Sequence, residues 1–117
     1  MKCFLVFGVT ILVSACTSQP KSQGQAETRE ESTIRLLENQ VTLPLGAYPL
    51  NRYDRFYAFT DAKVKAIYKI PRGRSGNVHI VEEDRLPIKF DGGCGVVNII
   101  FDTRTNAFEE IVCNGIA

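Results

Sequence analysis

One segment of the chain alternates apolar and lysine side chains, and this alternation constrains the fold more than any other feature. Successive side chains of a β-strand point to opposite faces of a sheet, so the pattern predicts a strand with one buried and one wet face. The apolar set is Val64, Ala66, Tyr68 and Ile70, and the other set is Lys63, Lys65 and Lys69, interrupted by Ile67. The aromatic-rich segment 52–59 precedes this strand across a short turn at 60–62, which predicts a β-hairpin.

Further strands are expected toward the C-terminus. Short apolar runs alternate there with clusters of Gly, Pro, Asp and Asn, which favour turns and loops. The expected strands are 78–81, 86–90, 96–101 and 107–112, and the expected loops are 71–77, 91–93 and 102–106. Because Pro87 cannot donate a main-chain hydrogen bond, segment 86–90 is expected at a sheet edge.

A helix is expected before the strands. Thr28 and Glu31 have the spacing of a capping box, and apolar residues then recur on one helical face. The apolar positions are Ile34, Leu37 and Val41, and Arg35, Glu38 and Asn39 are expected to point outward. A helix of about three turns is not stable alone, so it needs a sheet to pack on. The segment 43–50, with two prolines and a glycine, is expected to be a loop.

These patterns predict one small α+β domain at residues 32–117, with the helix packed on an antiparallel sheet of four to six strands. The chain has 117 residues, of which 44% are hydrophobic and 23% charged, as in ordinary globular domains. Its formal net charge is +1, which argues against a nucleic-acid partner.

A cysteine flanks each of the last two expected strands, Cys94 just before the first and Cys113 just after the second. We place a tight turn at Thr103 and Arg104. That register sets Cys94 directly opposite Cys113, at about the 4.5 Å Cα separation that a disulfide accepts. A five-residue loop would instead leave Cys94 opposite Asn114. With no Cys-X-X-Cys motif, we interpret the pair as a structural disulfide and not a redox site.

The N-terminus is typical of a targeting segment. Lys2 is followed by an apolar run at 3–13, which is shorter than the roughly 20 residues that a membrane-spanning helix needs. The run ends in Val13-Ser14-Ala15-Cys16, which resembles the lipobox of bacterial lipoproteins. The resemblance implies a signal peptide at 1–15 and a lipid on Cys16, with loss of Cys3 on cleavage. By the same analogy Thr17, in place of an aspartate, implies an outer-membrane anchor facing the periplasm.

The segment 16–31 is expected to be a flexible linker that runs into the helix. Its composition is almost entirely polar, so it cannot bury enough apolar surface to fold alone. The domain that follows resembles small envelope lipoproteins only at the level of fold, because the two-helix start of the outer-membrane assembly lipoproteins is missing.

The folded part offers little chemistry. His79 is the single histidine and lies between two strand residues, so we interpret it as a structural residue. The acidic run 82–84 is interpreted as a solvated turn, and the glycine-rich 91–95 lacks the lysine of a phosphate-binding loop. We therefore expect no metal, no cofactor and no enzymatic activity.

Charge is unevenly distributed. Segment 52–74 carries seven basic and two acidic residues, whereas segment 82–110 carries three basic and seven acidic ones. The basic part could contact an anionic surface. Alternatively, the two parts are neighbours in one sheet and screen each other. The candidate contact residues are Lys63, Lys65, Lys69, Arg72 and Arg74.

Two classes of function remain. The first is a lipid-anchored envelope protein whose domain is a non-enzymatic binding or scaffold module for an envelope protein or peptidoglycan. The second is a periplasmic enzyme inhibitor or ligand-binding lipoprotein, in which the loop 72–77 enters a partner's cleft.

Overall fold

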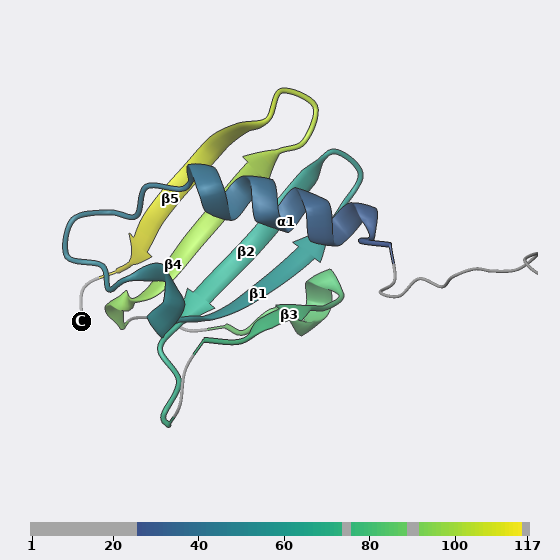
Figure 1. The fold of residues 1–117 in the computed structure, drawn as a ribbon. Helices are drawn as coiled ribbons and strands as arrows, with labels where there is room; N and C mark the ends of the chain where they lie inside the picture. The colour runs from purple at the N-terminus through teal and green to yellow at the C-terminus, as the bar shows by residue number, and fades with distance from the viewer. Residues whose placement is uncertain (1–25, 74–75, 89–91, 116–117) are drawn as a thin grey trace, which may run out of the picture.

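The structure is a computed structural model that describes residues 26–73, 76–88 and 92–115. One helix lies across one face of a five-stranded sheet, so the α+β prediction is confirmed (Figure 1). The elements are α1 (Arg29–Gln40), β1 (Asp54–Phe59), β2 (Lys63–Lys69), β3 (Val78–Ile80), β4 (Gly93–Asp102) and β5 (Ala107–Asn114), with 3₁₀ turns η1 (Leu50–Arg52) and η2 (Glu83–Arg85).

The sheet has the strand order β3-β1-β2-β4-β5 and is mixed. The hairpin β1–β2 is antiparallel as predicted, with Phe59 opposite Val64, and β2–β4 and β4–β5 are antiparallel too. β3 pairs parallel to β1, so the expectation of a wholly antiparallel sheet is wrong. The reason is topological: the loop after β2 carries the chain past β1 to its outer edge, where β3 starts from the same end of the sheet as β1.

Helix α1 begins as its sequence predicts, and two of its three predicted apolar positions are buried, while the third, Val41, follows the helix and is partly buried. The Thr28 hydroxyl accepts a hydrogen bond from the Glu31 N–H (3.0 Å), and the Glu31 carboxylate accepts one from the Thr28 N–H (3.1 Å). This capping box satisfies two of the free N–H groups at the helix start. Ile34 and Leu37 are buried against the sheet, which gives the short helix the support that it lacks alone.

The core lies between α1 and the facing side of the sheet. Of the four predicted inward positions, Val64, Ala66 and Tyr68 are buried, and Ile70, which follows the last residue of β2, is partly buried against the same core. Aromatic rings fill much of the layer, because β1 and β2 both place tyrosines on this face. The largest fully buried side chains are Tyr53, Tyr57, Tyr68, Phe101, Leu37, Ile99, Val64 and Val97.

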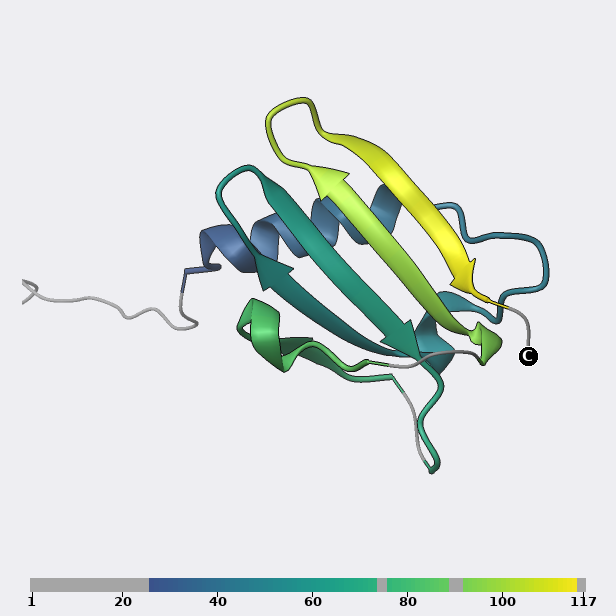
Figure 2. The same cartoon turned by 180° about the vertical axis from the view of Figure 1, so that it is seen from behind.

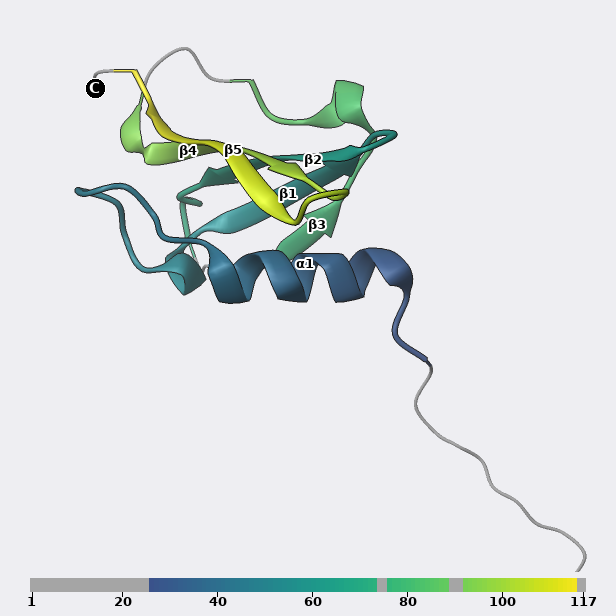
Figure 3. The same cartoon turned by 90° about the horizontal axis from the view of Figure 1, so that it is seen from above.

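The other face of the sheet is partly covered by the chain between β3 and β4. Figures 2 and 3 show η2 and the segment that follows it on the side of the sheet opposite α1. Residues 86–88 form no strand, so the expected edge piece at 86–90 is not found in its described part. Residues 89 and 90 lie outside the described residues, as does Asp91 of the expected turn 91–93.

The turn of the last hairpin differs from the predicted one. We placed it at Thr103 and Arg104, but all four residues 103–106 form the turn, and Asp102 pairs with Ala107. The Asp102 carboxylate accepts hydrogen bonds from two main-chain N–H groups of the turn, at 2.8 and 3.2 Å. An aspartate in this position stabilises a turn by satisfying its free donors, and here it stabilises the wider one.

The disulfide forms in spite of this different register. In the middle of the β4–β5 pair Ile99 lies opposite Ile111, and the same register pairs Cys113 with Val97. The pairing of β4 with β5 shifts between Gly93 and Val97, and this shift places Cys94 beside Cys113, with a Cα–Cα distance of 4.5 Å. The Cys94–Cys113 bond is therefore confirmed, whereas the regular ladder that we used to derive it is wrong.

Candidate functional site

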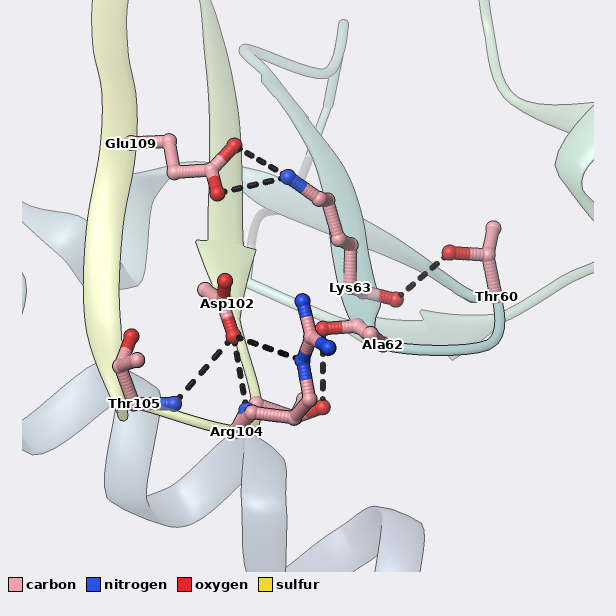
Figure 4. A network of polar contacts seen from close by, with 8 residues as sticks. Thr60, Ala62, Lys63, Asp102, Arg104, Thr105 and Glu109 are labelled. Carbon is pink, nitrogen blue, oxygen red and sulfur yellow. Dashed lines mark hydrogen bonds and ion pairs between the residues drawn. The ribbon is translucent and has the colours of Figure 1, made fainter.

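The candidate anionic-surface residues of β2 lie on the sheet face opposite α1, where the strand alternation predicts them. Lys63 donates to both carboxylate oxygens of Glu109 on β5, at 2.6 Å each (Figure 4). Lys65 forms an ion pair with Glu83 of η2. Both pairs are partly exposed, so each contributes little to stability, but each places a carboxylate beside a lysine of the face.

The remaining candidates lie toward the other end of β2. Lys69 is half-buried and Arg72 is exposed, and neither forms an ion pair with another described residue. Arg74 lies outside the described residues. The structure thus brings Lys63, Lys65 and Lys69 onto one face, with the charge of the first two balanced by acidic partners.

A buried polar cluster that sequence analysis missed joins α1 to the sheet. The Glu38 Oε2 accepts hydrogen bonds from Arg55 Nε (2.8 Å) and from the Tyr57 hydroxyl (2.5 Å). The Tyr57 and Tyr68 hydroxyls are 2.8 Å apart, and Arg55 also donates to two main-chain carbonyls. Glu38 therefore points inward, and our expectation that it points to solvent is wrong.

This cluster changes the acidity of its tyrosines. Burial raises the pKa of Tyr57 well above 10, and the neighbouring Tyr68 and Glu38 raise it further. Burial also raises the pKa of Tyr68. Two tyrosines held neutral beside a carboxylate act as hydrogen-bond donors and not as bases, so the cluster is suited to fixing the helix on the sheet. The signal in the sequence was that Arg55 shares its strand parity with Tyr57, on the buried face.

The loop between α1 and η1 forms a second exposed feature, the Leu45 loop (residues 43–49). The Tyr53 hydroxyl lies at its base, where it donates to the Cys94 carbonyl (2.5 Å) and accepts from the Tyr48 N–H (3.0 Å). The Cys94 Sγ lies 3.7 Å from the Leu45 carbonyl oxygen. The loop is thereby held against the disulfide while the Leu45 side chain is 98% exposed. A single exposed leucine is ordinary, but one at the tip of a loop with this support is suited to contact a partner.

His79 is a packing residue on the sheet face opposite α1. Its imidazole stacks on the Phe56 ring, with centroids 4.5 Å apart and planes 13° from parallel. Within the described segments, no group of three or more His, Cys, Asp or Glu side chains could hold a metal ion. An open groove of about 480 Å³ lies beside β3, lined by Glu30, Phe59, Ile80, Val81, Glu82 and Arg85.

The predicted lipidation site, Cys16, lies outside the described residues, as does Cys3. Among the residues that the structure places, no helix has both the length and the hydropathy needed to span a bilayer. Comparisons with models of protein families, with curated proteins and with solved structures gave no match.

Proposed function

We propose that this chain is a lipid-anchored protein of the bacterial outer membrane, facing the periplasm, whose domain is a non-enzymatic binding or scaffold module. The observation that carries the proposal is the order of segments along the chain. Val13-Ser14-Ala15-Cys16 follows a short apolar run, and a polar stretch then leads to a domain that starts with the capped helix α1. Two or more acyl chains on Cys16 would anchor such a domain stably.

The way in which the domain uses its ionisable groups supports a binding role. Glu38 and Arg55 join the helix to the sheet, Asp102 stabilises a turn, and His79 stacks on a phenylalanine. These side chains serve packing. The exposed Leu45 loop is the part of the domain best suited to meet a protein partner, because Tyr53 and the disulfide fix its main chain before binding.

The same loop favours the second candidate, a periplasmic enzyme inhibitor. A loop that is held in one conformation and presents one apolar side chain can enter a cleft at a small cost in entropy. The loop that we first assigned to this role, at 72–77, includes residues 74 and 75, which lie outside the described residues.

The anchor is tested by metabolic labelling with a fatty acid. We expect Cys16→Ser to abolish both the label and membrane association, because Cys16 alone would carry the thioether. Cys3→Ser is the matched control: it removes a thiol that the cleaved segment would carry, so the mature chain should still be labelled. Label retained on the Cys16→Ser chain would refute the lipoprotein assignment.

The binding role is tested by copurification from detergent-solubilised membranes, comparing the parent chain with Leu45→Ser and with Ile88→Ser, a change at another exposed apolar residue. A specific partner should be lost from Leu45→Ser alone. A soluble hydrolase as that partner would favour the inhibitor, and an outer-membrane complex would favour the scaffold module. Equal recovery with all three chains would contradict a role for the Leu45 loop.

A further inference from the structure

The two outer strands of the sheet differ in how well they are guarded against another strand. β5 carries Glu109 and Glu110, and Glu109 is an extra residue at a register shift opposite Ile100 and Phe101. Carboxylates and bulges are devices that discourage a further strand from adding to an edge. β3 consists of Val78, His79 and Ile80, with no Asp, Glu, Lys or Arg and no bulge.

The hydrogen bonds of β3 show which of its main-chain groups face outward. Arg55 N–H donates to the Asn77 carbonyl (2.8 Å) and Val81 N–H donates to the Tyr57 carbonyl (2.9 Å). Because the main-chain groups of alternate residues point to the same side of a strand, the N–H and C=O groups of His79 also point toward β1. The N–H and C=O groups of Val78 and Ile80 therefore point away from the sheet, along its edge.

The side chains of these two residues are exposed as well. Val78 is 44% exposed and Ile80 is 43% exposed, on the same sheet face as α1. Ile80 also lines the groove beside β3, together with Phe59 and Val81. The β3 edge thus combines main-chain donors and acceptors that pair with no described residue with exposed apolar side chains, which is the combination that strand addition uses.

We propose that two copies of this chain associate through β3, with the strands antiparallel about a twofold axis at His79. In this register Val78 of one copy lies opposite Ile80 of the other. Both residues point their main-chain groups outward, so each such pair exchanges two hydrogen bonds, as directly opposed residues of an antiparallel pair do. The twofold axis repeats the pair, and the two five-stranded sheets become one continuous sheet.

Charge complementarity favours a second copy as the occupant of this edge. Figure 1 shows the start of the β2–β3 loop near the end where β3 begins, and η2 at the end where β3 finishes. At the first of these ends Asp54 accepts a hydrogen bond from the Asn77 N–H and lies opposite Lys69 in the β1–β2 pair, and Arg72, three residues after β2, adds an exposed positive charge. Around η2 the exposed residues Glu82 and Asp84 form no ion pair with a described residue, and Arg85 offsets one of these charges. An antiparallel arrangement brings the basic end of each copy to the acidic end of the other. A parallel arrangement would place like charges together.

The test is the mass of the full chain in detergent, measured by sedimentation equilibrium across a concentration series. We expect a monomer–dimer equilibrium, because the contact is small. The Val78→Lys variant should be more monomeric than the parent chain, since each copy would then place a lysine against the apolar edge of the other. Val112→Lys is the matched control: Val112 is 45% exposed but lies on β5, so this variant should dimerise like the parent. Circular dichroism would confirm that both variants remain folded.

A covalent trap tests the register independently. In His79→Cys the two new thiols would lie opposite each other across the axis, at about the 4.5 Å Cα separation that a disulfide accepts. Oxidation by dioxygen with a copper–phenanthroline catalyst removes one proton and one electron from each thiol and joins the sulfurs. We expect a dimer that reducing agent dissolves, absent from the parent chain and from Glu110→Cys on β5. A parent chain that stays monomeric at every concentration, or a dimer lost in Val112→Lys but kept in Val78→Lys, would overturn the proposal.

Discussion

Removing the Glu38 carboxylate should cost this domain a large part of its stability. In the chain with Glu38→Ala, Arg55 keeps its two main-chain carbonyl partners but loses the carboxylate that it pairs with, and Tyr57 loses an acceptor at 2.5 Å. The side chains of Glu38 and Arg55 are 18% and 11% exposed, so solvent replaces little of the lost interaction. Removing one partner of a buried pair typically costs about 3–5 kcal/mol, and we expect about 3 kcal/mol here.

Urea unfolding followed by circular dichroism measures this change directly. For a domain of this size, each kcal/mol lowers Tm by roughly 4–8 °C, so Tm should fall by more than about 10 °C. Arg35→Ala is the control on the same helix: it breaks the exposed pair with Glu27 and should cost less than about 1 kcal/mol. The double variant Glu38→Met, Arg55→Met should recover much of the loss, because neither charge is left buried. A free energy of unfolding for Glu38→Ala within about 0.5 kcal/mol of the parent would refute this account of the cluster.

Three further results are expected. Reducing the Cys94–Cys113 bond should lower the free energy of unfolding by about 3 kcal/mol, since the bond closes a loop of 19 residues, and an unchanged melt after verified reduction would contradict this. The free energy of unfolding should fall as pH rises above about 10, because Tyr57 and Tyr68 ionise in the unfolded chain while their raised pKa values keep them neutral in the folded one. By linkage, each tyrosine lowers the free energy of unfolding by up to about 1.4 kcal/mol per pH unit. Tyr57→Phe should make this decrease shallower in urea titrations at alkaline pH. If the sheet face that carries Lys63, Lys65 and Lys69 contacts an anionic surface, co-sedimentation with anionic vesicles or peptidoglycan should decrease with salt. Binding should depend more on Lys69 and Arg72 than on Lys63 and Lys65, which form ion pairs within the domain. Equal binding by Lys69→Glu and the parent chain would contradict this role.

The sequence predicted those parts of the fold that local patterns determine. The capping box of α1, the buried face of β2 and the β1–β2 hairpin each depend on residues close together in the chain, and the structure confirms them. The parallel pairing of β3 depends on a non-local choice between the two edges of the β1–β2 hairpin, one on β1 and one on β2, and a three-residue strand gives no pattern that decides it. The inward position of Glu38 was missed for a related reason. Helical spacing places it beside Leu37, but only the tertiary partner Arg55 makes burial of its charge favourable.

The disulfide shows how a correct prediction can come from an incorrect local geometry. Pairing Cys94 with Cys113 requires only that two adjacent strands bring the thiols together, and many registers can do so if one strand is irregular. Here β4 is irregular between Gly93 and Val97, in a segment where three of the four residues 92–95 are glycines. Glycine permits such a distortion because it adopts positive φ without strain, as Gly92 (φ 123°) and Gly93 (φ 54°) do. The glycines next to Cys94 therefore let the bond form at the end of a hairpin whose turn sets a different register, and the Cys94 sulfur of the same bond lies against the Leu45 carbonyl.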